Sequence, residues 1–380
     1  MKTIVFIIMS LIVGLYFLIN LRKKPSANLH SVDAIVPAYN EELCIEDSLK
    51  SLFLNPYINK VICVNDGSSD GTKKVLDRMQ LEWPEKLIVV HQKNTGKGGA
   101  LMNGLNYAIT PQVFLTDADT YVPPDKHGLG YMLAEIENGA DAVGGIPSSN
   151  LNEAQLLPHI RATVKMPMII MKRTFQQWLG GAPFIISGSC GMFKVDILKE
   201  NGFSDRTKVE DLDLTWTWVA KGYKIRQANR CVVYPQECNT LSDEWKRWRR
   251  WIVGYAVCMR LHKKLLFSRY GIASILPMFL VIIFSFYVYI AHIIQTSLEQ
   301  GKLTDFIFMF FPMLWVIIVS IIGLFSAIYH RSWKLMFLAP LAIFYVILAY
   351  VIWLLYGVRA FFTGKEPVRD KPTRYKNVVE

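Results

Sequence analysis

The chain has 380 residues, enough for one large domain or two ordinary ones. It is 52% hydrophobic and only 19% charged, which excludes a disordered chain, a fibre and a disulfide-stapled mini-protein. The formal net charge of +11 fits nucleic acid, anionic lipid or an anionic substrate, and the apolar excess favours the last two.

The first 24 residues predict an N-terminal transmembrane anchor. Residues 4–20 are almost wholly apolar and are followed at once by Arg22, Lys23 and Lys24. A signal peptide would need a small-residue cleavage site, and none follows. Because basic residues flank the cytoplasmic ends of membrane segments, we expect the next part of the chain to lie in the cytoplasm.

Residues 25–242 predict one cytoplasmic α/β domain, in which short β-branched runs alternate with amphipathic stretches. The expected strands are 33–37, 60–65, 87–91 and 113–116, and the expected helices are 41–53, 72–79, 98–108 and 125–138. This alternation predicts a Rossmann-like, mostly parallel sheet. Ligands of such sheets bind beyond the carboxyl ends of the strands.

Three polar turns follow strands at this expected edge. The first contains Pro37, Tyr39 and Glu41, the second begins at Asp66, and the third covers residues 116–120. Asp and Gly are common in turns for conformational reasons, but three such turns at one edge favour a binding site.

The third turn contains two aspartates, Asp117 and Asp119, separated by one small residue. Alternate residues of an extended segment point the same way. Two carboxylates with few other ligands nearby suit Mg²⁺ or Mn²⁺ completed by phosphate oxygens. A D-x-D pair is a weak signal alone, and its position after a strand strengthens it.

Two further segments are rich in small residues. Residues 94–99 form a Gly-rich turn that opens a helix and contains Lys97, and their backbone N–H groups suit an anion or a plain turn. Walker A spacing is absent, so an ATPase is not indicated. Residues 187–191, which include Ser189, would let a substrate approach the backbone closely.

Glu210 and Asp211 open an expected helix at residues 210–220. Carboxylates in a first helical turn are common partners of the helix dipole. The functional interpretation makes Asp211 a general base that faces the sheet edge, with Glu210 beside it.

Residues 243–268 predict an amphipathic helical region at the membrane interface. At 100° per residue one stripe forms, and we expect its indoles to lie among the headgroups; it consists of Trp245, Trp248, Ile252, Tyr255 and Met259. Arg247, Arg250 and Trp251 lie about a third of a turn away. Guanidinium groups suit a diphosphate and an indole suits a sugar ring, whereas a cationic helix that binds anionic lipid is the alternative.

Residues 269–358 predict a transmembrane bundle with apolar runs at 271–295, 306–329 and 335–356. Counting these runs places the tail, residues 359–380, outside the cell, but its many basic residues argue for the inside. One run therefore either re-enters the membrane or lies along its surface. The six cysteines form no C-x-x-C pair and are expected to be buried thiols in a reducing compartment.

Together these motifs resemble the membrane-embedded, inverting family-two glycosyltransferases, which include poly-N-acetylglucosamine, hyaluronan, chitin and cellulose synthases. The resemblance spans residues 32–254 and implies a GT-A fold. It implies that Asp66 contacts the nucleotide base beside the turn at 37–41, and that Asp117 and Asp119 meet the metal and the diphosphate.

The resemblance also implies that Asp211 is the catalytic base, and that Arg247, Arg250 and Trp251 hold the diphosphate and the acceptor. The two segments rich in small residues separately predict that Lys97 and Ser189 contact the substrate. The resemblance further implies that folding gathers Asp66, Asp119, Asp211 and Arg250 around one pocket at the lipid–water boundary.

The expected activity is metal-dependent transfer from a UDP-sugar, with UDP-N-acetylglucosamine favoured, to a growing β-linked polysaccharide that is exported. Arg247 stands where many polymer synthases carry Gln, which resembles ceramide glucosyltransferases and leaves single addition to a membrane lipid as the alternative. A non-enzymatic scaffold is disfavoured because every acidic position of the motifs is occupied. We expect a multi-pass protein of the cell membrane that contacts membrane lipids and an accessory membrane or export protein, without nucleic acid.

Overall fold

The computed structural model describes residues 23–151, 155–277, 319–366 and 373–375. The predicted anchor at residues 4–20, and most of the apolar runs at 271–295 and 306–329, lie outside the described residues.

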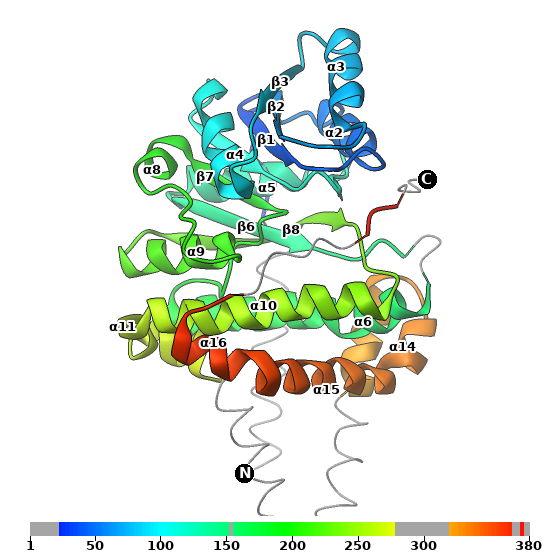
Figure 1. Ribbon diagram of the computed structural model, residues 1–380, viewed down its shortest axis with the longest axis vertical. Helices are drawn as coiled ribbons and strands as arrows, with labels where there is room; N and C mark the ends of the chain where they lie inside the picture. Colours follow the sequence, from blue (N-terminus) through cyan, green and yellow to red (C-terminus); the bar gives the residue numbers. More distant parts are fainter. Residues whose placement is uncertain (1–22, 152–154, 278–318, 367–372, 376–380) are drawn as a thin grey trace, which may run out of the picture.

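An eight-stranded sheet forms the centre of the protein, in the order β3-β2-β1-β4-β7-β6-β8-β5 (Figure 1). The strands are β1 (Val32–Ala38), β2 (Ile58–Asp66), β3 (Leu87–Gln92), β4 (Gln112–Leu115), β5 (Thr120–Tyr121), β6 (Ala142–Pro147), β7 (Gly191–Lys194) and β8 (Ile225–Pro235). The four strands predicted from the sequence are confirmed within one or two residues at each end.

The sheet is mixed: four of its seven strand pairs are parallel, as predicted for most of the sheet, and three are antiparallel. Strands β3, β2, β1 and β4 are parallel, but β7 pairs antiparallel with both β4 and β6, and β5 pairs antiparallel with β8. The start of β7 at Gly191 lies opposite the end of β4 at Leu115. Residues 187–190 therefore enter the sheet from the edge at which β4 ends.

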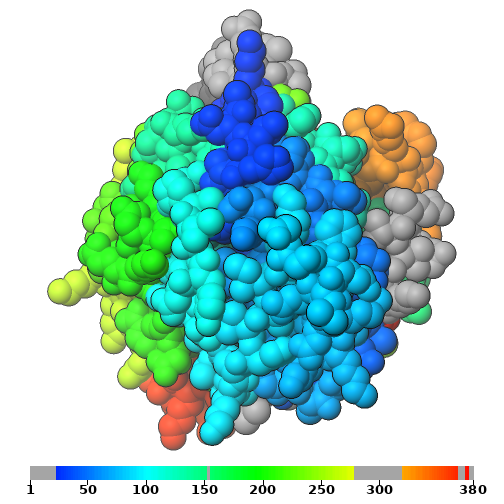
Figure 2. Space-filling view, turned by 90° about the horizontal axis from the view of Figure 1, so that it is seen from above, coloured from blue at the N-terminus to red at the C-terminus, as the bar shows by residue number. Residues whose placement is uncertain are grey.

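Helices cover the sheet and continue into a separate helical layer. Those of the first part are α2 (Ile45–Phe53), α3 (Thr72–Glu82), α4 (Gly96–Gly104), α5 (Gly128–Glu137), α6 (Leu156–Pro167), α7 (Arg173–Gly180), α8 (Val195–Glu200) and α9 (Glu210–Ala220). Figure 2 shows the face of the protein that is turned away from the helical layer. The blue-to-cyan chain from β1 to α4 covers most of this face.

Helix α2 begins at Ile45, four residues later than predicted. The intervening turn is held by polar contacts to the turn after β2: the backbone N–H of Asn40 donates to Ser68 Oγ at 3.0 Å, and that of Glu41 donates to Thr72 Oγ1 at 2.8 Å. Asn40 also adopts a left-handed φ of 53°. These bonds compete with helix formation and hold the two turns together.

The helical layer consists of α6, the long helix α10 (Leu241–Leu261) and the apolar helix Lys334–Thr363, which lies alongside α10 (Figure 1). The apolar helix combines α14 (Lys334–Leu338), α15 (Ile343–Ile352) and α16 (Val358–Thr363) with short 3₁₀ and π segments between them. The short α11 (Lys263–Leu266) follows α10.

The aromatic stripe of α10 packs against this apolar helix, and the position of its indoles among lipid headgroups stays a prediction. Trp248 stacks on Tyr345 with ring centroids 5.7 Å apart, and Trp245 meets Tyr356 edge-on at 6.3 Å. Ile352 is fully buried in the same cluster. Protein side chains cover the stripe because a second amphipathic helix supplies a complementary aromatic face.

Among the described residues, Lys334–Thr363 is the one helix long and apolar enough to cross a membrane. Its C-terminal end nevertheless returns to the sheet domain. Glu366 accepts hydrogen bonds from Thr207 Oγ1 at 2.5 Å and from the Lys208 backbone N–H at 2.6 Å. Arg374 contacts Glu41 and Asp119. The tail thus lies on the same side as the sheet domain.

We predict that a cysteine in the tail and a cysteine in the sheet domain face the same compartment. Lys365→Cys and Lys74→Cys both replace exposed lysines, and the six native cysteines are buried. A membrane-impermeant maleimide should label both variants in vesicles of one orientation and neither in the opposite orientation. Labelling of the two positions in opposite preparations would contradict this arrangement.

Candidate active site

The Asp66 carboxylate at the end of β2 stabilises the start of α4. It accepts hydrogen bonds from the backbone N–H groups of Thr95 at 2.8 Å and Gly96 at 2.9 Å, and from Gln92 Nε2 at 2.8 Å. The prediction that the N–H groups of the turn at 94–99 suit an anion is met within the protein for two of them, since those of Thr95 and Gly96 bind the Asp66 carboxylate. Asp66 is 3% exposed and fixes the helical turn that carries Lys97.

Lys97 joins two acidic motifs that are about ninety residues apart in the sequence. Its Nζ lies 2.5 Å from Asp117 Oδ1 and 3.8 Å from Glu210 Oε1, and it donates to the Gly188 carbonyl at 3.5 Å. Burial lowers the pKa of Lys97, but Asp117, Glu210 and Asp211 outweigh that effect and raise it above its usual value. The lysine is therefore charged, and it neutralises carboxylates that would otherwise repel one another.

Asp211 lies in the first turn of α9, and the chain around residue 188 fixes its orientation. The Gly188 backbone N–H donates to Asp211 Oδ2 at 2.9 Å. Burial, and then the neighbouring Glu210, raise the pKa of Asp211, while Lys97 acts in the opposite direction. A carboxylate with a raised pKa is a better proton acceptor at neutral pH, as a general base requires.

The small residues at 187–191 allow this close approach. A side chain on Gly188 would place its Cβ 2.6 Å from Lys97 Nζ and 3.4 Å from Asp211 Oδ2. The next residue, Ser189, is 7% exposed, and its carbonyl accepts a hydrogen bond from Thr116 Oγ1 at 2.9 Å. The segment therefore lies beside the D-x-D turn and contacts the predicted base.

Asp119 is contacted by a residue that is 255 positions later in the chain. Its Oδ2 lies 2.6 Å from Arg374 Nη1, and the same guanidinium donates to both carboxylate oxygens of Glu41, at 2.8 and 3.0 Å. Burial raises the pKa of Asp119 to about 6, while Arg374 opposes the shift. In the first turn, Pro37 lies within β1, and Tyr39 is 41% exposed.

Arg247 does not point a free guanidinium at a substrate, which corrects its predicted role. Its Nη1 lies 3.1 Å from Glu237 Oε2, and its Nη2 pairs with Glu244. Arg161 of α6 joins the same cluster, 2.6 Å from Glu237. Two buried carboxylates draw the cation inward because an unpaired buried charge is costly.

Trp251 lies above this ionic cluster with 37% of its surface exposed. The guanidinium carbons of Arg161 and Arg247 are 5.2 and 5.5 Å from its ring. Arg250, one residue before it, is half-buried on α10.

The contacts of the described residues join Asp66 to the turn of Lys97, and Lys97 to Asp117, Glu210 and Asp211.

Sequence reasoning missed the ionic partners supplied by distant segments. Arg374 was counted only as a basic tail residue, and Arg161 and Glu237 were not singled out. Arg173 was also missed: its Nη2 donates to Ser187 Oγ at 3.0 Å beside the Asp211 loop. A charged residue within an otherwise apolar helical run, as in residues 156–180, is the signal that could have indicated Arg161 and Arg173.

The described residues contain no group of three or more His, Cys, Asp or Glu side chains that could enclose a metal ion. Asp117 and Asp119 nonetheless fit a divalent cation whose remaining ligands come from a diphosphate, the usual arrangement for Mg²⁺. The position of Arg374 supports this fit, since a cationic group already lies against the buried carboxylate of Asp119.

A mixed, Rossmann-like sheet with an aspartate pair after β4 defines a GT-A-like transferase. A model of glycosyl transferase family 2 matches residues 33–202. The chain is 63% identical over 380 residues to the uncharacterized glycosyltransferase YaiP of Escherichia coli K12, covering 100% of this chain and 95% of that protein. The chain therefore belongs to glycosyl transferase family 2, and it is a glycosyltransferase.

Two more distant similarities add detail. The chain is 31% identical over 242 residues to poly-beta-1,6-N-acetyl-D-glucosamine synthase of Staphylococcus aureus strain COL, covering 62% of this chain and 58% of the synthase. The mannosyltransferase PcManGT of Pyrobaculum calidifontis, solved with GDP-Man and Mn²⁺, superposes with a TM-score of 0.56 at 18% identity, covering 93% of this chain and 95% of that one. The second similarity shows the fold alone.

We predict that Lys97→Gln lowers sugar transfer about a hundredfold, the usual scale for loss of one placed electrostatic group. Because Lys97 lowers the pKa of Asp211, the acidic limb of the pH–rate profile should also move to higher pH. Nucleotide release measured across pH tests both effects. Lys93→Gln, which changes an exposed lysine just before this turn, is the control. An unchanged acidic limb in Lys97→Gln would contradict the coupling.

Proposed function

We propose that this glycosyltransferase transfers a sugar from a UDP-sugar to an acceptor hydroxyl with inversion at the anomeric carbon. The observation that carries the proposal is the ion cluster of Lys97. It places the D-x-D aspartate Asp117 and the E-D pair Glu210 and Asp211 around one buried ammonium group. A diphosphate-binding motif and a candidate base thus belong to one site.

In this proposal Asp211 removes the proton from the acceptor hydroxyl as its oxygen attacks the anomeric carbon. The C–O bond to UDP breaks on the opposite face of the sugar, so the configuration inverts. Gly188 keeps Asp211 oriented, and Glu210 raises its proton affinity. Asp66 and the turn with Pro37, Tyr39 and Glu41 are proposed to face the nucleoside.

Asp117 and Asp119 are the proposed ligands of Mg²⁺ or Mn²⁺. When bound, such an ion supplies neutralisation of the charge that develops on the diphosphate leaving group. Arg250 and Trp251 of α10, with Ser189, are proposed to contact the diphosphate and the acceptor. Arg247 instead positions Trp251 through its contacts with Glu237 and Glu244.

The proposed donor is UDP-N-acetylglucosamine, and the proposed product is a β-linked polysaccharide extended at the membrane, processively and with export. The support is the 31% identity to the staphylococcal synthase, whose name specifies that sugar. We further propose a multi-pass arrangement with the sheet domain in the cytoplasm, contact with membrane lipids and an accessory membrane or export protein.

One observation favours a second candidate, single addition to a membrane lipid. The apolar helix Lys334–Thr363 lies along α10 and covers its aromatic stripe, so in this arrangement it adds no wall to a transmembrane channel. A lipid acceptor needs no channel, because it can reach the site from the membrane surface.

We predict that Asp211→Asn reduces turnover at least a thousandfold while UDP binding stays within about twofold of the unchanged protein. The amide keeps a similar shape and can still accept the Gly188 hydrogen bond, but it cannot take up a proton at neutral pH. Asp196→Asn, an exposed acid of α8, is the matched control. Turnover that survives in Asp211→Asn would remove this residue from the mechanism.

The product separates the two candidates. Purified protein in nanodiscs is incubated with radiolabelled UDP-N-acetylglucosamine, and separately with UDP-glucose, UDP-galactose, UDP-glucuronate and GDP-mannose. A ladder on a gel is expected for polymer synthesis, whereas a single organic-soluble spot indicates one addition to a lipid. If none of the five donors releases nucleotide above the level of Asp211→Asn, the proposed donor class is wrong.

A further inference from the structure

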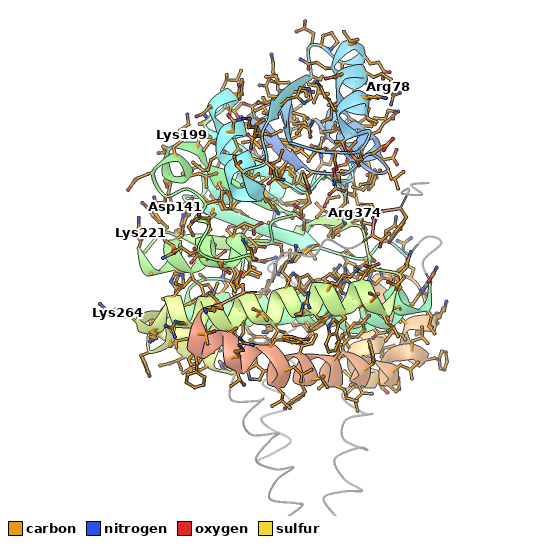
Figure 3. The ribbon with its side chains drawn as sticks, in the orientation of Figure 1. Arg78, Asp141, Lys199, Lys221, Lys264 and Arg374 are labelled. Atoms are coloured by element: carbon orange, nitrogen blue, oxygen red, sulfur yellow. The ribbon has the colours of Figure 1, made fainter. Side chains whose placement is uncertain are left out.

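The tail segment, residues 373–375, lies in the candidate donor site. Figure 3 labels Arg374 above the helical layer and level with β8. The segment is separated by about 250 residues from the D-x-D turn and by about 330 from the first polar turn. It nevertheless contacts both, and its contacts join the sheet edge to the beginning of α10.

Backbone and side-chain contacts on both sides of Arg374 hold the segment in place. The backbone carbonyl of Tyr375 accepts a hydrogen bond from Gln236 Nε2 at 2.6 Å, and the backbone N–H of Tyr375 donates to Gln236 Oε1 at 3.4 Å. The Tyr375 hydroxyl donates to the Glu237 carbonyl. Thr373 Oγ1 donates to Asp243 Oδ1 at 3.5 Å. The binding surface is thus the connection between β8 and α10, which also supplies Glu237 to the ionic cluster under Trp251.

Arg374 itself lies between two buried carboxylates. Glu41 is 6% exposed and Asp119 is 7% exposed, and Arg374 is within 3.0 Å of both side chains. Its planar guanidinium binds Glu41 with two parallel bonds and still reaches Asp119 Oδ2 through Nη1. Two desolvated carboxylates that face each other would repel, so this cation stabilises the region.

We propose that Arg374 is an internal cation of the donor site, which competes with the divalent metal for Asp119 and keeps the site closed until metal and nucleotide displace the tail segment. The inference rests on the proposed role of Asp119. Arg374 Nη1 lies 2.6 Å from Asp119 Oδ2, so a metal held by this carboxylate would lie close to a second cation, and the two would repel each other. A divalent ion offers Asp119 two positive charges, where the guanidinium offers one, and the bound diphosphate holds that ion at the site.

The competition sets the apparent affinity for the metal. If the tail segment is bound in about nine molecules of ten, the apparent dissociation constant of the metal is raised about tenfold, because only the open fraction can bind it. The tail segment thereby makes metal binding at Asp119 depend on the presence of metal and nucleotide together. An enzyme with a buried charged site gains protection against occupation by metal alone.

The test measures Mn²⁺ binding by calorimetry in full-length protein in nanodiscs, with saturating UDP. Arg374→Ala is expected to bind Mn²⁺ about tenfold more tightly than the unchanged chain. Lys365→Ala removes one charge from an exposed position of the same C-terminal region and should leave the affinity unchanged. Asp119→Ala should lose most Mn²⁺ binding. Equal affinity in Arg374→Ala and the unchanged chain, or weaker binding in Arg374→Ala, would overturn the competition.

A second readout does not depend on any substitution. Hydrogen–deuterium exchange at the Tyr375 amide, which is bonded to Gln236, should accelerate when Mn²⁺ and UDP are added together. Unchanged exchange with the site saturated would also overturn the inference.

If Asp119→Ala binds Mn²⁺ as well as the unchanged chain, the proposed donor site is wrong. If only Asp119→Ala loses binding and Arg374→Ala behaves normally, the donor site stands and the tail's role fails.

Discussion

The buried ammonium group of Lys97 is the interaction on which the candidate site depends. Asp117, Glu210 and Asp211 come from two separate motifs and would repel one another in a desolvated space. One cation among them makes their approach stable and opposes the rise in the pKa of Asp211 that burial and Glu210 cause. Asp66 positions that cation by holding the first turn of α4, and Gly188 leaves room for it.

A second ionic cluster organises the other side of the site. Glu237 pairs with Arg161, Lys165 and Arg247, and this cluster lies under the half-exposed ring of Trp251. The connection that carries Glu237 also binds the tail segment through Gln236. The α6–α10 layer, the end of β8 and residues 373–375 are therefore joined by a continuous set of polar contacts.

The described residues of the tail lie on the side of the sheet domain. Sequence counting with three C-terminal runs placed the tail opposite the sheet domain, against its basic residues. In the structure Lys334–Thr363 lies along α10, and both Glu366 and Arg374 contact the sheet domain. The described residues of the tail therefore lie against the sheet domain, as the basic character of the tail predicts.

The sequence by itself determined the first four strands, helix α9 and the acidic motifs, because each depends on local periodicity or on residues adjacent in the chain. It also indicated the family through the joint pattern of those motifs. Only the tertiary structure decided that β7 runs antiparallel, that Arg247 is paired inward and that α10 is covered by protein. Only it placed Arg374 on Asp119. Such contacts join residues that are far apart in the sequence, so no local pattern predicts them. Which charged group pairs with which, and which helix faces pack together, depends on burial and on the other groups present in the fold.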